Sequence, residues 1–252
     1  MRRGFRELAL LILLYVAYSA SRLFADDSFA PAAERARDLL GVERWLLLDF
    51  EHALNVWFAT QDAVGLVASY WYATLHYIVT AVVLVWLYRR GWDAYQPARQ
   101  ALAIATVLGL VLYLLVPMAP PRLLPDYVDV LQLHSASGWW GGEASAPRGL
   151  GGLTNQLAAF PSLHAGWALW VALVVRRHAG SPAVRALAWF YAAGTSVVIV
   201  GTGNHWVLDA VVGWVVVLVG WEIARTSGSF EVRFARTSTI QQLGVTRESA
   251  RR

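Results

Sequence analysis

The chain has 252 residues, of which 57% are hydrophobic and only 15% are charged, and its formal net charge is +4. The apolar residues stand in long runs instead of alternating with polar ones, which is typical of an integral membrane protein. All 21 basic residues are arginine, and there is no cysteine. The lack of cysteine excludes disulfide bonds, thiolate catalysis and cysteine-ligated metals.

Six apolar stretches are long enough, or nearly long enough, to cross a bilayer, which takes roughly 20 residues of helix. They lie at about 7–24, 64–88, 100–117, 161–176, 185–202 and 206–224. We therefore predict an all-α polytopic membrane protein with six transmembrane helices. We expect the first stretch to be retained as a helix, because its start is basic and no small-residue cleavage site follows it.

The distribution of arginine predicts the orientation of these helices. Most arginines fall near the N-terminus, in and beside the turns 89–99 and 177–184, or in the tail from residue 225 onward. Cytoplasmic segments carry the excess of positive charge, so we place both termini in the cytoplasm of a plasma-membrane protein. The basic excess then reports topology, and no nucleic-acid partner is needed to explain it.

A single membrane-embedded domain is expected over residues 1–225, followed by a disordered cytoplasmic tail over 226–252. In the segment 33–58, apolar residues recur at steps of three and four. This pattern predicts an amphipathic helix lying in the outer interface, with a simple extramembrane hairpin as the alternative. The external loop 117–160 is long and rich in proline and glycine, so it is a candidate lid or substrate-binding segment.

The predicted topology brings four ionisable residues to the outer face. His164 opens the fourth helix, His205 and Asp209 open the sixth, and Arg122 follows the third. Ionisable groups at membrane depth are costly and usually functional. A single histidine at an interface is more often an anchor than a catalyst, but independent anchors have no reason to gather at the same helix starts.

These residue types suit phosphoryl transfer. His205 and Asp209 are four residues apart, so they share a helix face and the carboxylate can orient the imidazole. One histidine can then attack phosphorus while His164 protonates the leaving oxygen. The planar guanidinium of Arg122 suits two phosphate oxygens.

The two helix starts also predict an anion site, because N-termini offer free backbone N–H groups and a positive dipole end. We expect Asn204 or Gly203 to cap the sixth helix and Pro161 to lie in the first turn of the fourth. At the sixth helix we expect the N–H groups at its start, beside Asn204, to face the anion. At the fourth helix we expect the N–H groups of Ser162, Leu163 and His164 to do so.

The motifs around these residues resemble those of a known family. "PSLH" followed by "HWVLD" resembles the second and third signatures of the type 2 phosphatidic acid phosphatase (PAP2) superfamily, which also contains lipid phosphotransferases and vanadium haloperoxidases. The fuller pattern resembles its inositol phosphorylceramide synthase branch, through "YWYATLHY", "MAPPRLLPD", "AAFPSLHAGWALW" and "GTGNHWVLDAVVGW". The similarity runs from about residue 40 to 222.

The resemblance implies a six-helix PAP2-like bundle and a role for each residue. His205 would be the nucleophile that forms a phosphohistidine, Asp209 its orienting partner and His164 the general acid. Arg122 would bind phosphate, assisted by the backbone at Ser162 and Leu163. The resemblance implies no metal and no other cofactor, so arginine and N–H groups would carry the transition-state charge.

The sequence also departs from the superfamily pattern. The usual first signature contains a lysine, of which this chain has none, and the usual arginine upstream of the third-signature histidine is absent from "VVIVGTGNH". Arg122 would then bear more of the charge. Arg148 in the external loop is a candidate replacement, with a solvated loop arginine as the alternative, and Asn155 is a similar candidate. His76 is either a buried histidine hydrogen-bonded to a neighbour, or a residue that supports the site or binds the head group.

The sequence therefore predicts an integral membrane phosphatase or phosphotransferase that acts on a lipid phosphate or phosphodiester at the outer leaflet. Water as acceptor makes it a phosphatase, and a lipid alcohol makes it a head-group transferase. A non-enzymatic transporter or binding protein for a phospholipid or anion is the alternative. Against it, the sequence shows neither internal repeats nor interrupted helices in both halves.

Overall fold

The computed structural model describes residues 28–48, 50–141, 148 and 155–227, together with residues 4, 5, 7, 9, 12, 13 and 16. Most of the predicted span 7–24 and nearly all of the predicted tail 226–252 lie outside the described residues. Within the described part the chain is helical, with an isolated β-bridge between Met118 and Ala158. The all-α prediction is confirmed for this part of the chain.

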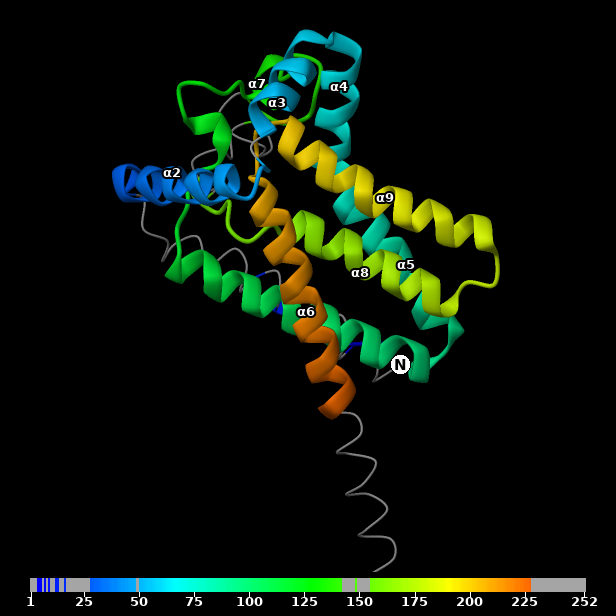
Figure 1. Cartoon of the computed structure of the whole chain (residues 1–252). Coiled ribbons are helices and arrows are strands. Elements are labelled where there is room, and N and C mark those ends of the chain that lie inside the picture. The colour runs from blue at the N-terminus through cyan, green and yellow to red at the C-terminus, as the bar shows by residue number, and fades with distance from the viewer. Residues whose placement is uncertain are drawn as a thin grey trace, which may run out of the picture.

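Figure 1 shows the helices of the described residues, coloured in chain order from blue toward red. They are α2 (Phe29–Trp45), α3 (Glu51–Thr60), α4 (Asp62–Tyr70), the π-helical segment η2 (Trp71–Leu75), α5 (His76–Arg90), α6 (Trp92–Leu115), the 3-10 turn η3 (Pro121–Leu123), α7 (Val130–Leu133), α8 (Leu163–His178), α9 (Pro182–Gly201) and a final helix, Val207–Ser227.

Four helices in the described part are long and apolar enough to cross a membrane. They are Asp62–Arg90, which joins α4, η2 and α5, then Trp92–Leu115, Pro182–Gly201 and Val207–Ser227. They match the predicted spans 64–88, 100–117, 185–202 and 206–224, so these four predictions are confirmed as helices of spanning length. The chain is therefore a polytopic membrane protein.

The predicted fourth span, 161–176, corresponds to α8, which has only 16 residues. This is shorter than the roughly 20 residues that cross a bilayer, so the predicted count of six spans is not confirmed. The surroundings of α8 explain its apolar sequence in another way, because Ala168, Trp170, Ala172 and Val174 are all fully buried within the protein. Packing against α5, α6 and α9 fills its surface instead of lipid.

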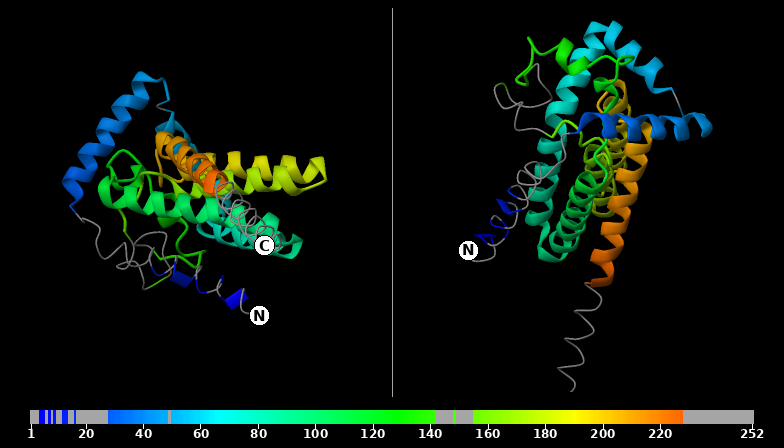
Figure 2. Two further views of the ribbon diagram at one scale, coloured as in Figure 1. Left: turned by 90° about the horizontal axis from the view of Figure 1, so that it is seen from below. Right: turned by 90° about the vertical axis from the view of Figure 1, so that its left-hand side faces the viewer.

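The predicted continuous helix over 33–58 is wrong, because the structure has two helices, α2 and α3, with a break between them. Leu47 in the break has φ 59°, a left-handed backbone that cannot continue a right-handed helix. Both figures show α2 lying across the long helices, close to the start of the final helix (Figures 1 and 2). Trp45 and Leu47, at the end of α2 and in the break, are 81% and 86% exposed.

The starts of α8 and of the final helix approach each other closely. A Cβ atom built on Gly166 would lie 2.9 Å from the carbonyl oxygen of Gly213, and one built on Gly213 would lie 2.1 Å from the carbonyl oxygen of Ser162. Glycine at both positions lets the two backbones touch. In the same region the backbone N–H of Ser162 donates to the carbonyl oxygen of Asp209 at 2.9 Å. These contacts hold the two predicted histidine-bearing helix starts side by side.

Candidate active site

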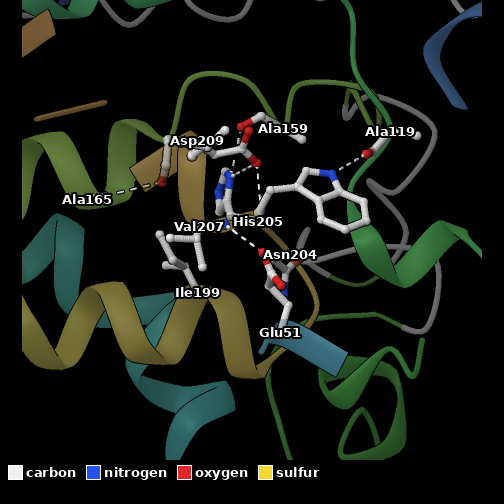
Figure 3. A network of polar contacts seen from close by, with 12 residues as sticks. Glu51, Ala119, Ala159, Ala165, Ile199, Asn204, His205, Val207 and Asp209 are labelled. Atoms are coloured by element: carbon white, nitrogen blue, oxygen red, sulfur yellow. Dashed lines mark hydrogen bonds and ion pairs between the residues drawn. The ribbon is translucent and has the colours of Figure 1, made fainter. Parts of the chain in front are cut away.

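His205 lies in the turn between α9 and the final helix and is only 3% exposed. Figure 3 shows the Asp209 carboxylate and the backbone at Ala159 on the same side of its ring. Its Nδ1 atom is 2.8 Å from the carbonyl oxygen of Ala159 and 3.5 Å from Oδ2 of Asp209. The closer partner is therefore a backbone carbonyl, which the sequence analysis did not anticipate.

The contact with Ala159 determines which ring nitrogen of His205 carries the proton. A carbonyl oxygen can only accept, so Nδ1 must donate, and Nε2 keeps its lone pair. Burial lowers the pKa of His205 to about 4, and the positive charge of Arg122 acts in the same direction. The free ring is therefore neutral near neutral pH, as a nucleophile requires. The Ala159 carbonyl is held in turn, because the N–H of Ala159 donates to Met118 at 3.3 Å.

Asp209 lies in the first turn of the final helix and is fully buried. Its Oδ2 atom accepts the backbone N–H of Trp206 at 2.8 Å, which caps the helix from within. Since the same oxygen is 3.5 Å from Nδ1 of His205, the carboxyl group both caps the start of the helix and lies beside the imidazole. The predicted pairing of the two side chains is therefore present, although Asp209 is not the closest partner of the ring.

His164 lies in the first turn of α8 and faces His205, with 5.8 Å between the ring centroids. Tyr72 stacks on the His164 ring at 4.3 Å, and the His76 ring lies 4.0 Å from it. The Nε2 atom of His164 is buried and has no hydrogen-bond partner among the described residues. His164 therefore keeps a ring nitrogen that can donate or accept a proton.

His76, predicted as either a buried histidine or a head-group ligand, is 8% exposed and belongs to the same cluster. Its Nδ1 atom is 3.0 Å from the carbonyl oxygen of Tyr72, so Nδ1 carries the proton here too. The π-helical segment η2, Trp71–Leu75, directly precedes it. π-helical turns are frequent at functional sites because they rotate side chains out of the regular helical register.

Arg122 follows α6, as predicted, and its side chain is 7% exposed. Its Nε atom donates to Oδ1 of Asn204 at 3.0 Å, and its Nη1 atom lies 3.4 Å from Oδ2 of Asp129. Its backbone N–H donates to the carbonyl oxygen of Gly203 at 2.7 Å. These contacts hold the guanidinium beside the turn that carries His205.

The predicted anion site is present at only one of the two helix starts. Ser162 is the N-cap of α8, and its side chain accepts the N–H of Ala165 at 3.3 Å. Pro161 therefore precedes the cap, and its predicted place in the first helical turn is wrong. No acceptor among the described residues reaches the N–H groups of Leu163 and His164, so both remain available to an anion.

The start of the final helix differs from the prediction. The helix begins at Val207, so neither Asn204 nor Gly203 is its cap, and the side chain of Asn204 contacts Arg122 and Thr202 instead. Carboxylates already accept the first backbone N–H groups of this helix. The pairs are Trp206 with Asp209, Val207 with Glu51, and Leu208 with Glu43. This helix start is therefore not an open anion site.

Arg148, the candidate replacement for a missing phosphate ligand, contacts its own loop. Its guanidinium donates to backbone carbonyl oxygens at 135, 136, 138 and 140. Its Nε and Nη2 atoms therefore hold the external loop. Asn155 likewise makes a local contact, since its Oδ1 atom accepts the N–H of Leu157 at 2.9 Å.

Four contributors to the site were missed by sequence reasoning: the carbonyl of Ala159, and the side chains of Glu43, Glu51 and Asn55. The Nδ2 atom of Asn55 donates to the carbonyl oxygens of Gly201 and Val128, which fixes the chain just before His205. A backbone carbonyl has no sequence signal at all. Glu43 and Glu51 did carry a sequence signal, because they stand in the segment 33–58, whose recurring apolar residues were already recognised.

The fold and the site define a class of protein: a helical membrane protein in which two adjoining helix starts bring paired histidines and an arginine to one buried centre. The comparison with protein families identifies it further. The profile of the PAP2 superfamily matches residues 37–223, so the chain belongs to the PAP2 superfamily, and the resemblance seen in the motifs is confirmed at that level. The match does not distinguish the predicted inositol phosphorylceramide synthase-like branch.

A solved structure shows the same fold. The crystal structure of Aquifex aeolicus LpxE is similar, with a TM-score of 0.53 and 19% sequence identity, over 71% of this chain and 94% of that chain. At this level of identity the likeness concerns the fold. No protein among the curated sequences matches the chain.

Proposed function

We propose that the protein is a membrane phosphatase or phosphotransferase that acts on a lipid phosphate or phosphodiester through a phosphohistidine at His205. The observation that carries this proposal is the contact between Nδ1 of His205 and the Ala159 carbonyl at 2.8 Å. It leaves the lone pair on Nε2, on a neutral and buried ring that faces a second histidine. A ring that served only as an interfacial anchor would need neither the fixed tautomer nor the facing histidine.

The reaction proceeds in two steps at this centre. Nε2 of His205 attacks phosphorus, the bond from phosphorus to the leaving oxygen breaks, and His164 gives its proton to that oxygen. Burial and the neighbouring His205 lower the pKa of His164 to about 3 in the free protein, so in this proposal the negative charge of the bound phosphate is what lets His164 carry that proton. As the new bond forms, His205 becomes positively charged, and the Asp209 carboxylate and the Ala159 carbonyl stabilise the proton on Nδ1. Water or an alcohol then attacks phosphorus, His164 takes its proton, and His205 leaves.

The charge that develops on the phosphoryl oxygens needs donors that are in place beforehand. Arg122 supplies a guanidinium that Asn204 and Asp129 hold in position. The N–H groups of Leu163 and His164, at the start of α8, supply the helix-terminus contribution. Since the chain contains no lysine, Arg122 carries the main cationic role in this proposal.

The acceptor decides between hydrolysis and transfer. His76 and Tyr72 both contact the ring of His164, so they are placed to meet the leaving or the incoming alcohol. The similarity of "YWYATLHY" to the inositol phosphorylceramide synthase branch favours an alcohol acceptor at this position. A phosphatase would use the same residues with water.

The membrane placement forms part of the proposal. The arginine pattern puts His164 and His205 at the outer leaflet of the plasma membrane. Exposed apolar side chains at the end of α2 and just beyond it, Trp45, Leu46, Leu47 and Phe50, suit burial in the outer interface. The substrate would reach the centre sideways from that leaflet.

The test is phosphate release from a panel of lipid phosphates by the purified protein in detergent, beside His205→Ala. Alcohol acceptors and a chelator are added in separate arms. His178→Ala is the matched control, because His178 ends the same helix that His164 begins. We expect release that survives chelation, is unchanged by His178→Ala and falls by more than about a thousandfold in His205→Ala.

The other outcomes separate the alternatives. Head-group exchange that requires both a phosphodiester donor and a lipid alcohol would identify a transferase. Binding of lipid phosphate without release or exchange, and unaffected by His205→Ala, would contradict the enzymatic proposal and favour a transporter or binding protein.

A further inference from the structure

Two buried carboxyl groups meet the catalytic turn from outside the bundle. Glu43 lies on α2 and Glu51 begins α3, and both side chains are fully buried. Carboxyl groups are almost never fully buried unless they are paired. Neither residue belongs to a motif that the proposed reaction uses, so their burial needs another explanation.

Each carboxyl group accepts a backbone N–H at the start of the final helix. The N–H of Leu208 donates to Oε1 of Glu43 at 2.7 Å, and the N–H of Val207 donates to Oε1 of Glu51 at 3.5 Å. These two donors lie between His205 and Asp209 in the sequence. A negative group at a helix N-terminus is favourable both for its hydrogen bonds and for the helix dipole.

The remaining oxygen of each carboxyl group is also buried. Oε2 of Glu43 and Oε2 of Glu51 have no donor among the described residues, and the two side chains interact with each other. Two ionised carboxylates that interact in this way would repel each other, whereas one proton between them forms a hydrogen bond. Burial, together with Glu51, raises the pKa of Glu43 to about 9.

Among the described residues, the ionisable side chains that act on Glu43 are acidic. Asp209 of the final helix adds a further negative charge beside Glu43. Tyr127, in the segment before α7, also faces the pair, and its pKa is raised to about 12 by burial and by Glu51 and Glu43. Arg44 and Asp126 act on Tyr127 with opposite signs.

A third residue of the outer helices extends the attachment to the other side of His205. Asn55 on α3 donates to the carbonyl oxygen of Gly201 at 3.0 Å and exchanges two hydrogen bonds with Val128. Gly203 fits against it, because a Cβ atom there would lie 3.1 Å from Nδ2 of Asn55. The chain is therefore held from α2 and α3 both before and after the catalytic histidine.

We propose that Glu43 and Glu51 are positioning residues that share one proton and hold the start of the final helix in the geometry that His205 and Asp209 require. The proposal rests on the function proposed above for the same site. It assigns to the outer helices a part in catalysis: they fix the nucleophile through its helix and do not touch the substrate.

Because Glu43 and Glu51 share one proton, their contacts with the start of the final helix are sensitive to alkaline pH. The folded protein binds the proton of Glu43 more tightly than the unfolded chain does, because the pKa rises from 4.5 to about 9. The stabilisation of the folded protein by this proton is therefore complete below pH 4.5, the ordinary pKa. It is lost as the pH rises through about 9, the pKa in the folded protein. Above about pH 9 two carboxylates would face each other, and the start of the final helix would shift.

The test compares wild type with Glu43→Gln across this pH range. Glutamine keeps the acceptor for Leu208 and replaces the shared proton with an amide N–H that cannot ionise. We expect Glu43→Gln to keep kcat near the wild-type value at neutral pH and the ratio of its kcat to that of wild type to rise by about tenfold above pH 9. Glu34→Gln, a change at an exposed position on the same helix, should leave that ratio at one throughout.

Two further measurements make the test decisive. Glu43→Ala removes the acceptor and the proton together, and we expect kcat to fall by about tenfold or more with KM unchanged. The Tm of wild type should fall between pH 4.5 and about 9 by more than that of Glu43→Gln. The difference between the two proteins is the quantity measured, because it removes the contribution of other titrating groups.

Identical pH profiles of kcat and Tm in wild type and Glu43→Gln would overturn the proposal, as would a folded Glu43→Ala protein with wild-type kcat. If Glu43→Ala does not fold, the comparison with glutamine still decides the question. A wild-type protein that releases no phosphate would instead contradict the proposed function, and the Tm profiles would still show whether the two carboxyl groups share a proton.

Discussion

Replacing Gly213 by alanine should separate the two helix starts that form the centre. A Cβ atom at this position would lie 2.1 Å from the carbonyl oxygen of Ser162, 3.1 Å from its carbonyl carbon and 3.5 Å from the N–H nitrogen of Gly166. The obstacle is backbone and cannot rotate away. The same carbonyl accepts the N–H of Gly166 at 3.1 Å, which ties it to the first turn of α8.

The size of the displacement follows from ordinary contact distances. Non-bonded heavy atoms rest about 3.5 Å apart, so the helices must move apart by roughly 1 to 1.5 Å. The hydrogen bond from Ser162 to Asp209, 2.9 Å long, joins the same two helices and would be stretched. Overpacking of this kind costs about 1–3 kcal/mol of stability, and a misplacement of 1 Å can cost about a hundredfold in rate.

The assay is kcat for phosphate release together with Tm in detergent. We expect Gly213→Ala to remain folded at reduced Tm and to lose about a hundredfold in kcat, because His164 moves away from His205. Gly41→Ala is the matched control, since Gly41 lies within α2 and a Cβ there meets nothing within 4 Å. Its Tm should be unchanged or higher.

A folded Gly213→Ala protein with wild-type kcat would refute the reasoning. It would mean that the close approach of the two helix starts does not set the distance between the histidines. A loss of kcat that matched the loss of folded protein, with normal turnover in the remainder, would show that the glycine serves stability alone.

Two predictions concern the residues around the phosphate. Arg122→Lys should lower kcat/KM for phosphate release by about a hundredfold or more, because an ammonium cannot keep the contacts to Asn204 and Asp129 and still meet two phosphate oxygens; near wild-type rates would show that Arg122 does not bind the phosphate. Asp209→Asn should lower kcat by slowing the step in which His205 attacks. The double variant with His205→Ala should be no slower than His205→Ala alone, and additive losses would indicate two independent roles.

Several features of the fold were predictable from the order of the residues. Bilayer thickness requires apolar runs of a certain length, so the four long helices appear in the sequence as the stretches 64–88, 100–117, 185–202 and 206–224. The same criterion does not decide the case of 161–176, because an apolar run also results when a short helix is buried in protein. The periodicity of apolar residues wrongly predicted one helix over 33–58, because the repeat continues across the break at Leu47.

The candidate active site likewise contains residues that the sequence predicted and a group that it did not. His164, His205, Asp209 and Arg122 were identified in advance, because titratable groups at apolar helix starts are conspicuous by composition and spacing, and the structure does bring them together. The Ala159 carbonyl was not identifiable, since every residue carries an identical backbone oxygen. Which of these oxygens faces His205 depends on the bridge between Met118 and the segment 157–159.

Composition, run length and motif spacing were sufficient for the membrane class, the superfamily and the identity of the two histidines, because each of these can be read from short stretches of the chain. The tautomer of His205, the capping of the final helix by Glu43 and Glu51 and the engagement of Arg148 by its own loop were decided only by the tertiary structure. Each depends on which acceptor reaches which donor, and for the two glutamates these partners lie more than 150 residues apart in the sequence.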